Sequence, residues 1–251
     1  MTYCLAANVD AGLVFVSDSR TNAGIDQLGV HSKMHAFNDL PGRRFTLLSA
    51  GNLATTQAVI AGLRRDIREK AAVSLATIER MRDAADYVGL LNRRMVEKYG
   101  DGETKDGFVP SADFIFGGQI GDKAQALFLI YSQGNYISPT AQVPFLQIGE
   151  QKYGRPILDR IVHTNTRLET VALCGLVSMD STIRSNASVG PPIEVMLYRT
   201  SLSAPPIHIV YGEDHPYLRT IRESWAVNLR RAFDDLPPLH LPEGNVRLVE
   251  N

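Results

Sequence analysis

Alternation of hydrophobic and other residues predicts that the chain begins with β-structure. The β-forming stretches cover residues 2–9, 13–16, 33–37 and 43–50, and a hairpin turn, Asp10-Ala11-Gly12, joins the first two. From Asn52 the pattern changes to the 3.6-residue period of an amphipathic helix, and a second such stretch follows Ser74. Four strands are therefore expected before two helices.

The second half of the chain alternates strands and helices again. Strands are expected at residues 112–119, 124–131, 145–148, 193–198 and 208–211. One helix is expected after Lys152-Tyr153-Gly154-Arg155, and another over residues 214–235. Between them, Thr166 and Glu169 have the spacing of a capping box and predict the start of a further helix.

This order of elements suits two antiparallel sheets packed face to face with helices on both outer sides. We therefore predict the α+β class and a four-layer αββα sandwich. No linker or low-complexity segment divides the chain, so residues 1–251 are predicted to form one domain. Its tail, about 236–251, contains Pro237, Pro238 and Pro242 and is expected to be extended.

Composition narrows the functional classes. The 251 residues are 44% hydrophobic and 21% charged, as in an ordinary soluble protein. The formal net charge of −1 provides no basic field for binding nucleic acid or an acidic membrane surface. Two distant cysteines, Cys4 and Cys174, suit a reducing compartment, so a cytoplasmic location is expected.

The first third of the chain holds the candidate chemistry. If Met1 is removed, Thr2 carries both a hydroxyl nucleophile and an α-amine that can act as its base. The ordinary pKa of such an amine is about 8, and a nearby Lys33 ammonium would lower that pKa. Asp18, at the end of the strand paired with the first one, is placed to hold Lys33, and Arg20 could brace the carboxylates around it.

Attack on a carbonyl also needs backbone N–H donors for the oxyanion. Ser49-Ala50-Gly51 lies where a strand is expected to turn into a helix, and Gly51 would let a carbonyl approach the main chain near a helix N-terminus. Taken singly these features are ordinary, since Asp18-Ser19-Arg20 also suits a surface turn and Lys33 a solvated lysine. Their occurrence together and in this order favours catalysis.

The other candidate residues are better explained by structural roles than by chemistry. Cys4 lies in an alternating strand and is expected in the core. The six histidines lack metal-ligand spacing, and the glycine-rich stretch at 117–121 is not followed by a phosphate-binding helix. We therefore expect neither a metal nor a cofactor.

Together the motifs resemble those of proteasome β-type subunits in the N-terminal-nucleophile hydrolase superfamily, and most of all the bacterial Anbu (ancestral β subunit) family. The segments that carry the resemblance are MTYC at 1–4, GLVFVSDSRTNAG at 12–24, Lys33-Met34, IGEQKYG at 148–154 and SMDSTIRSN at 178–186. The resemblance implies the αββα sandwich, a threonine nucleophile exposed by loss of Met1, and assembly into a multi-subunit particle.

The resemblance also implies a role for each matching residue. Thr2 resembles the family nucleophile and base, Asp18 and Lys33 its charged partners, Gly51 its oxyanion donor, and Asp180 the acid that orients the N-terminal amine.

Two helper serines of the family are missing from this chain. Glu150 stands where the first would lie. Ile183 stands where the second would lie, and Ser181 or Ser185 could substitute for that second serine. These departures bear on the efficiency of peptide cleavage more than on the presence of the site.

These inferences predict a threonine hydrolase that cleaves peptide or other amide bonds. Two alternatives stay open: an assembly or scaffold subunit with a vestigial site, which the missing serine favours, and an amidase or transamidase for a small molecule. The amphipathic helices after Asn52 and Ser74 are the expected contact surfaces of a homo-oligomer, either a closed ring or an open helical turn. The sequence identifies no ATPase partner.

Overall fold

The computed structural model describes residues 1–22, 28–100 and 109–239. One antiparallel sheet consists of β1 (Tyr3–Val9), β2 (Gly12–Ser17), β10 (Phe145–Gly149), β11 (Ile193–Arg199) and β12 (Ile207–Tyr211). Its strands lie in the order β10-β1-β2-β11-β12, so the predicted N-terminal hairpin occupies its centre.

In the second antiparallel sheet, the strands lie side by side in the same order as in the sequence. It consists of β5 (Met34–Phe37), β6 (Arg43–Gly51), β7 (Ala112–Ile120), β8 (Ala126–Ile130) and β9 (Tyr136–Ile137). A separate two-stranded ribbon pairs β3 (Arg20–Asn22) with β4 (Leu28–Val30).

The described residues contain five helices. They are α1 (Leu53–Arg68), α2 (Met81–Gly100), α3 (Arg155–Ile161), α4 (Leu168–Ser185) and α5 (Pro216–Asp234). The predicted mixed α+β class with antiparallel sheets is confirmed. No described helix combines the length and apolarity that a membrane crossing requires.

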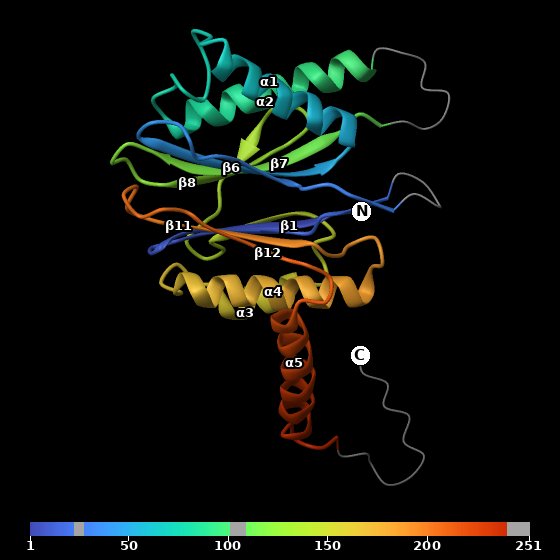
Figure 1. Ribbon diagram of the computed structural model, residues 1–251. Helices are drawn as coiled ribbons and strands as arrows, with labels where there is room; N and C mark the ends of the chain where they lie inside the picture. Colours follow the sequence, from blue (N-terminus) through green and yellow to red (C-terminus); the bar gives the residue numbers. More distant parts are fainter. Residues whose placement is uncertain (23–27, 101–108, 240–251) are drawn as a thin grey trace, which may run out of the picture.

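The period-2 alternation of the strands explains how these elements pack. In β6, Leu47 packs in a cluster with residues of α1 and α2, whereas the adjacent Leu48 packs between the two sheets. In β1, Leu5 packs in the cluster with α4, and Cys4 points between the sheets. Figure 1 shows the same arrangement: α1 and α2 lie outside the second sheet, and α3 and α4 lie outside the first.

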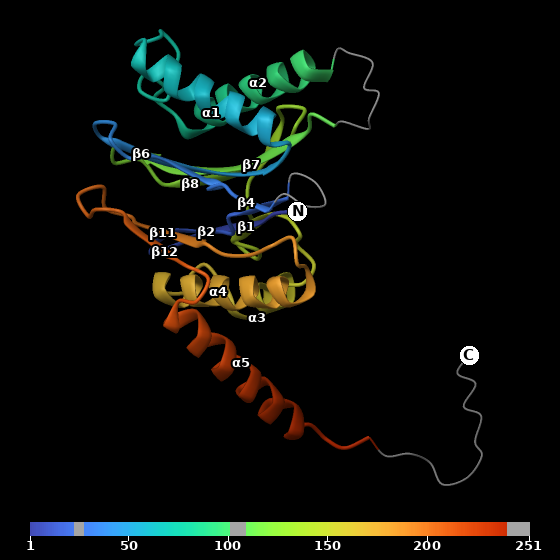
Figure 2. The same cartoon turned by 45° about the vertical axis from the view of Figure 1, so that its right-hand side comes forward.

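Helix α5 extends away from the α4 layer, as both views show (Figures 1 and 2). Ile221 is its only buried residue, and Val227 and Phe233 are exposed. Residues 240–251, most of the tail expected to be extended, lie outside the described residues.

Two boundaries differ from the sequence prediction. Six strands rather than four precede α1, because the short segments of β3 and β4 pair with each other. Helix α2 begins at Met81 rather than after Ser74. The N–H groups of Thr77 and Ile78 close a turn on the Ser74 carbonyl, and the Arg43 guanidinium binds the carbonyl oxygens of Leu75 and Ile78.

The predicted capping box at Thr166 is also wrong. Arg167 is the N-cap of α4 and makes no side-chain capping bond. The Thr166 hydroxyl instead accepts a hydrogen bond from the His163 N–H and donates to the Ile161 carbonyl. Thr166 therefore closes the turn after α3, which competes with its use as a helix cap.

Two helical glycines provide a test of this packing. A Cβ atom on Gly89 of α2 would overlap the carbonyl oxygen of Gly134, between β8 and β9, whereas one on Gly62 of α1 would meet only Leu91 at 3.9 Å. Gly89→Ala should therefore destabilise the protein by about 1–3 kcal/mol. Gly62→Ala should stabilise it by roughly 0.5–1 kcal/mol through helix propensity. Denaturant unfolding of both variants measures the difference, and equal effects of the same sign would contradict it.

Candidate active site

The N-terminus enters the first sheet at one end of β1. Tyr3 pairs with Gly149 of β10, the Glu150 N–H donates to the Thr2 carbonyl at 2.8 Å, and the Tyr3 N–H donates to Asp18 Oδ1 at 3.0 Å. Backbone contacts on both sides thus fix Thr2. It is half-buried and lines a cavity of about 420 Å³ together with Lys33 and Gly51.

A buried ion pair lies beside this cavity. Lys33 Nζ lies 2.6 Å from Asp18 Oδ1, and their side chains are 8% and 0% exposed. The ammonium also donates to the Arg20 carbonyl at 2.7 Å, and the Gly190 N–H donates to Asp18 Oδ2 at 3.2 Å. The sequence prediction that Asp18 holds Lys33 agrees with this geometry.

Opposing effects act on the Asp18 carboxyl. Burial has the largest effect and raises the pKa of this carboxyl overall, while Lys33 and the N–H groups of Tyr3 and Gly190 act to lower it. These contacts all come from donors, so each one favours the ionised form. The short contact between Lys33 and Asp18 has the geometry of an ion pair, and Lys33 is a positively charged residue that lines the cavity.

The N-terminal amine experiences the same charges. In the chain that carries Met1, burial and then Lys33 lower the pKa of this amine, whereas Asp18 and Glu150 raise it. Met1 itself is 65% exposed. Its removal would place the amine on Thr2, one residue nearer to the ion pair.

Gly51 lies where β6 ends and α1 is about to begin. Its φ of +104° is a conformation that favours glycine, and a Cβ atom here would overlap the Ser111 carbonyl oxygen. The next residue, Asn52, caps α1 by accepting the Thr55 N–H at 3.1 Å. The wall of the cavity at this point is thus bare backbone at the N-terminal end of a helix.

Arg20 contributes differently from the prediction. Its carbonyl oxygen helps to hold Lys33, but its guanidinium donates to the Ala187 carbonyl at 2.9 Å and lies 3.6 Å from the exposed Glu213. Arg20 therefore braces the segment after α4 rather than the Asp18 carboxylate.

The predicted residues of α4 make contacts away from the amine. Asp180 is 8% exposed, and its Oδ1 accepts from Arg222 of α5 at 2.9 Å. The Ser181 hydroxyl donates to the Val177 carbonyl of its own helix, and Ser185 is the exposed last residue of α4. The charges that act on the amine are Lys33, Asp18 and Glu150. The roles predicted for Asp180, Ser181 and Ser185 stay predictions.

Sequence analysis missed two residues of this region. Glu150, treated only as a replacement for a serine, is 9% exposed and accepts from Asn186 at 3.0 Å close to the N-terminus. His35 lines the cavity with its Nε2 3.3 Å from Ser49 Oγ. Burial, and then Arg64, lower the pKa of His35 to about 4, so its imidazole is neutral at pH 7. The alternation of inward-facing and outward-facing residues along β5 is the sequence pattern that could have identified His35 as a residue near the site.

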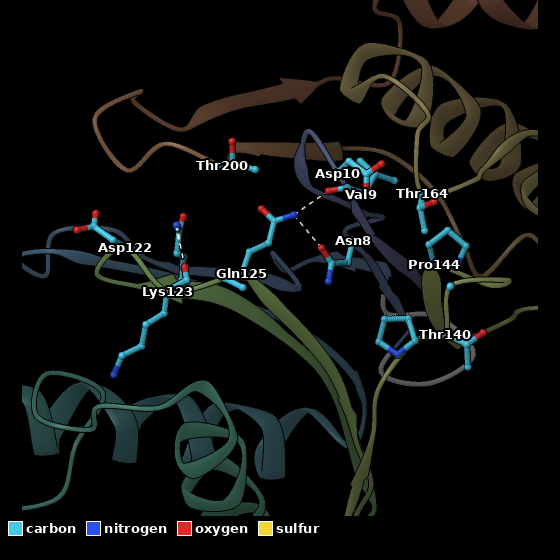
Figure 3. Close-up of a pocket in the computed structure, with 14 residues that line it drawn as sticks. Asn8, Val9, Asp10, Asp122, Lys123, Gln125, Thr140, Pro144, Thr164 and Thr200 are labelled. Carbon is cyan, nitrogen blue, oxygen red and sulfur yellow. Dashed lines mark hydrogen bonds between the residues drawn. The ribbon is translucent and has the colours of Figure 1, made fainter.

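A larger cavity, about 570 Å³, lies at the other end of β1 and contains none of the predicted site residues. Asn8, Val9 and Asp10 line it, and the Gln125 side chain donates to Asn8 Oδ1 and to the Val9 carbonyl at 2.8 Å each (Figure 3). Its polar groups contact one another, and no nucleophile paired with a base occurs among its lining residues. The predicted residues Thr2, Lys33 and Gly51 line the cavity at the Thr2 end instead. No group of three or more potential metal ligands occurs in the described ranges.

Comparison with solved structures gives full-length similarities. The chain is similar to Anbu (ancestral beta-subunit) from Yersinia bercovieri, with 40% identity and a TM-score of 0.87 over 96% of this chain and 100% of that one. It is similar to Anbu from Pseudomonas aeruginosa, described as a helical assembly, with 41% identity and a TM-score of 0.89 over 95% and 98%. A Gly-1 mutant of Anbu from Hyphomicrobium sp. strain MC1 gives 39% identity and a TM-score of 0.87 over 96% and 100%.

Neither a family profile nor a curated protein sequence matches the chain. The solved structures are sufficient to assign the family, because they combine about 40% identity with nearly complete coverage of both proteins. The chain belongs to the Anbu family of proteasome-like β-subunits.

Proposed function

We propose that this protein is a threonine hydrolase of the N-terminal-nucleophile type, which cleaves peptide or other amide bonds after Met1 has been removed. The observation that carries the proposal is the buried Lys33–Asp18 pair at a cavity that Thr2 and Gly51 also line. A fixed ammonium beside an N-terminal amine favours the neutral amine, which is the form that acts as a base.

In the first step, Thr2 Oγ attacks the amide carbonyl carbon while the Thr2 amine accepts the hydroxyl proton. The carbonyl oxygen becomes an oxyanion, for which the Gly51 N–H is the proposed donor. The carbon–nitrogen bond then breaks, and the protonated amine gives its proton to the leaving nitrogen. The products of this step are a free amine and an ester between the acyl group and Thr2 Oγ.

Water completes the reaction. The Thr2 amine accepts a proton from the water as its oxygen attacks the ester carbon, and the same proton returns to Thr2 Oγ when the ester bond breaks. A carboxylic acid is released and the free threonine is restored. Lys33 acts throughout as a fixed positive charge rather than as a proton donor, because Asp18 and the Arg20 carbonyl hold its ammonium.

We further propose that the chain forms one domain with the four-layer αββα arrangement and works as a homo-oligomer in the cytoplasm. The packing of helices on the outer faces of the two sheets supports the first statement (Figure 1). The helical assembly described for the Pseudomonas aeruginosa protein supports the second. The two cysteines are buried and unpaired, which suits a reducing compartment.

Nucleophile substitution tests the function directly. Thr2→Ala removes the hydroxyl but leaves a small N-terminal residue, so hydrolysis of a peptide library should fall by a factor on the order of 10³ or more. Thr2→Ser keeps both reacting groups and should retain turnover. Intact mass after treatment with a β-lactone should show an adduct only on wild type and Thr2→Ser, in chains that lack Met1. Turnover by Thr2→Ala would disprove the mechanism, and an unlabelled wild type would favour a scaffold subunit.

The pH dependence of β-lactone labelling reports the pKa of the Thr2 amine. Burial and Lys33 lower the pKa of the Met1 amine in the chain that carries Met1. The same surroundings are expected to act on the Thr2 amine once Met1 is removed, so the labelling rate should reach half its maximum below pH 8. Lys33→Met removes a group that lowers this pKa, so the profile should move to higher pH. Glu150→Gln removes a group that raises it, so the profile should move to lower pH. Shifts of the same sign in both variants would contradict this account.

A further inference from the structure

A second cavity adjoins the proposed site on the far side of two glycines. It measures about 310 Å³ and shares Ala50, Gly51 and Gly149 with the cavity that Thr2 lines. Gly149 is packed so closely against Thr2 that a Cβ atom there would overlap the Thr2 carbonyl oxygen. A substrate whose carbonyl lies between Thr2 and Gly51 therefore extends into both cavities, one half on each side.

The order of steps in the proposed reaction indicates which half of the substrate occupies which cavity. The acyl half stays bonded to Thr2 after the first step, so it occupies the cavity that Thr2 itself lines. The leaving amine occupies the second cavity, which Thr2 does not line. The side chains there consequently contact the part of the substrate that follows the cleaved bond.

Asp113 is the charged residue of this second cavity. It lies on β7 directly opposite Ala50 of β6, and directly opposite residues of paired strands share a face. Ala50 packs between the two sheets, so the Asp113 side chain is also on the face between the sheets, next to Gly51 in the register.

The surroundings hold Asp113 in place. The Ser132 N–H donates to its Oδ1 at 3.1 Å. The fully buried Asn92 of α2 ties the ends of β7 and β8 together by donating to the carbonyls of Ala112 at 2.8 Å and Tyr131 at 3.1 Å. The carboxyl therefore belongs to a rigid wall rather than to a loop.

This carboxyl is half-buried and has no compensating charge within the described residues. Burial raises its pKa, and the Ser132 N–H is the one group that lowers it. Lys33, by comparison, is already paired with Asp18. A partly desolvated carboxylate that lacks a cation favours a ligand that supplies one.

We infer that Asp113 determines specificity on the leaving side, and that the preferred substrates are peptides with a basic side chain on the residue directly after the cleaved bond. The inference rests on the proposed function and deepens it. The ammonium or guanidinium of that residue pairs with Asp113, while the Gly51 and Gly149 backbone leaves room for the main chain.

The test compares two acyl-peptides that differ only in carrying lysine or norleucine after the cleaved bond. Wild type should cleave the lysine peptide with a kcat/KM about tenfold higher, the size expected of one partly desolvated ion pair. Asp113→Asn should reduce this ratio to about 1 by slowing only the lysine peptide. Asp122→Asn, a matched change in the exposed turn at the other end of β7, should leave the ratio as in wild type.

A second measurement separates this inference from the proposed function. Lysine amide, the leaving half alone, should slow β-lactone labelling of Thr2 in wild type more than norleucine amide does, and the difference should vanish in Asp113→Asn. Normal labelling combined with equal cleavage of the peptides, or equal protection by the amides, would overturn the Asp113 assignment alone. A wild type that the β-lactone does not label would overturn the proposed function and this inference with it.

Discussion

The candidate site depends on one buried ion pair, Lys33–Asp18, because it links the end of a strand in the first sheet to the start of a strand in the second. Asp18 follows β2, Lys33 precedes β5, and the Asp18 carboxylate also accepts N–H groups from Tyr3 and Gly190. Burying two charges is costly unless their hydrogen bonds are complete, and here the second acceptor for Lys33 is the Arg20 carbonyl. The same contacts that offset desolvation hold the first strand, the second sheet and the segment before β11 around Thr2.

Much of this arrangement follows from local patterns. Alternation predicts the strands on both sides of the site, since each has one face toward a helix layer and the other toward the opposite sheet. The contact between Asp18 and Lys33 was predicted from charge chemistry and strand order, and Gly51 from its place between a strand and a helix. Such features depend on neighbours in the sequence and on the general behaviour of charges, which is why they were accessible without coordinates.

The parts that sequence reasoning missed are set by distant partners. The guanidinium of Arg43 captures carbonyl oxygens more than 30 positions away and keeps the segment after Ser74 from joining α2. Arg222 of α5 reaches Asp180 of α4, and Asn186 reaches Glu150. No periodicity reports these contacts, because single side chains make them across elements whose relative positions appear only in the folded chain.

The pairing of Tyr3 determines which residue of the chain lies at the edge of the site. Tyr3 is fixed by its register with Gly149 and by its N–H bond to Asp18, so Thr2 is identified by being one residue before a fixed point. Successive side chains of an extended strand point in opposite directions. Inserting one residue between Thr2 and Tyr3 would therefore reverse the direction of the Thr2 side chain while Tyr3 keeps its register with Gly149. Under the proposed mechanism, the register of β1 therefore specifies which residue must be N-terminal, and the Met1–Thr2 bond is the one that has to be cleaved.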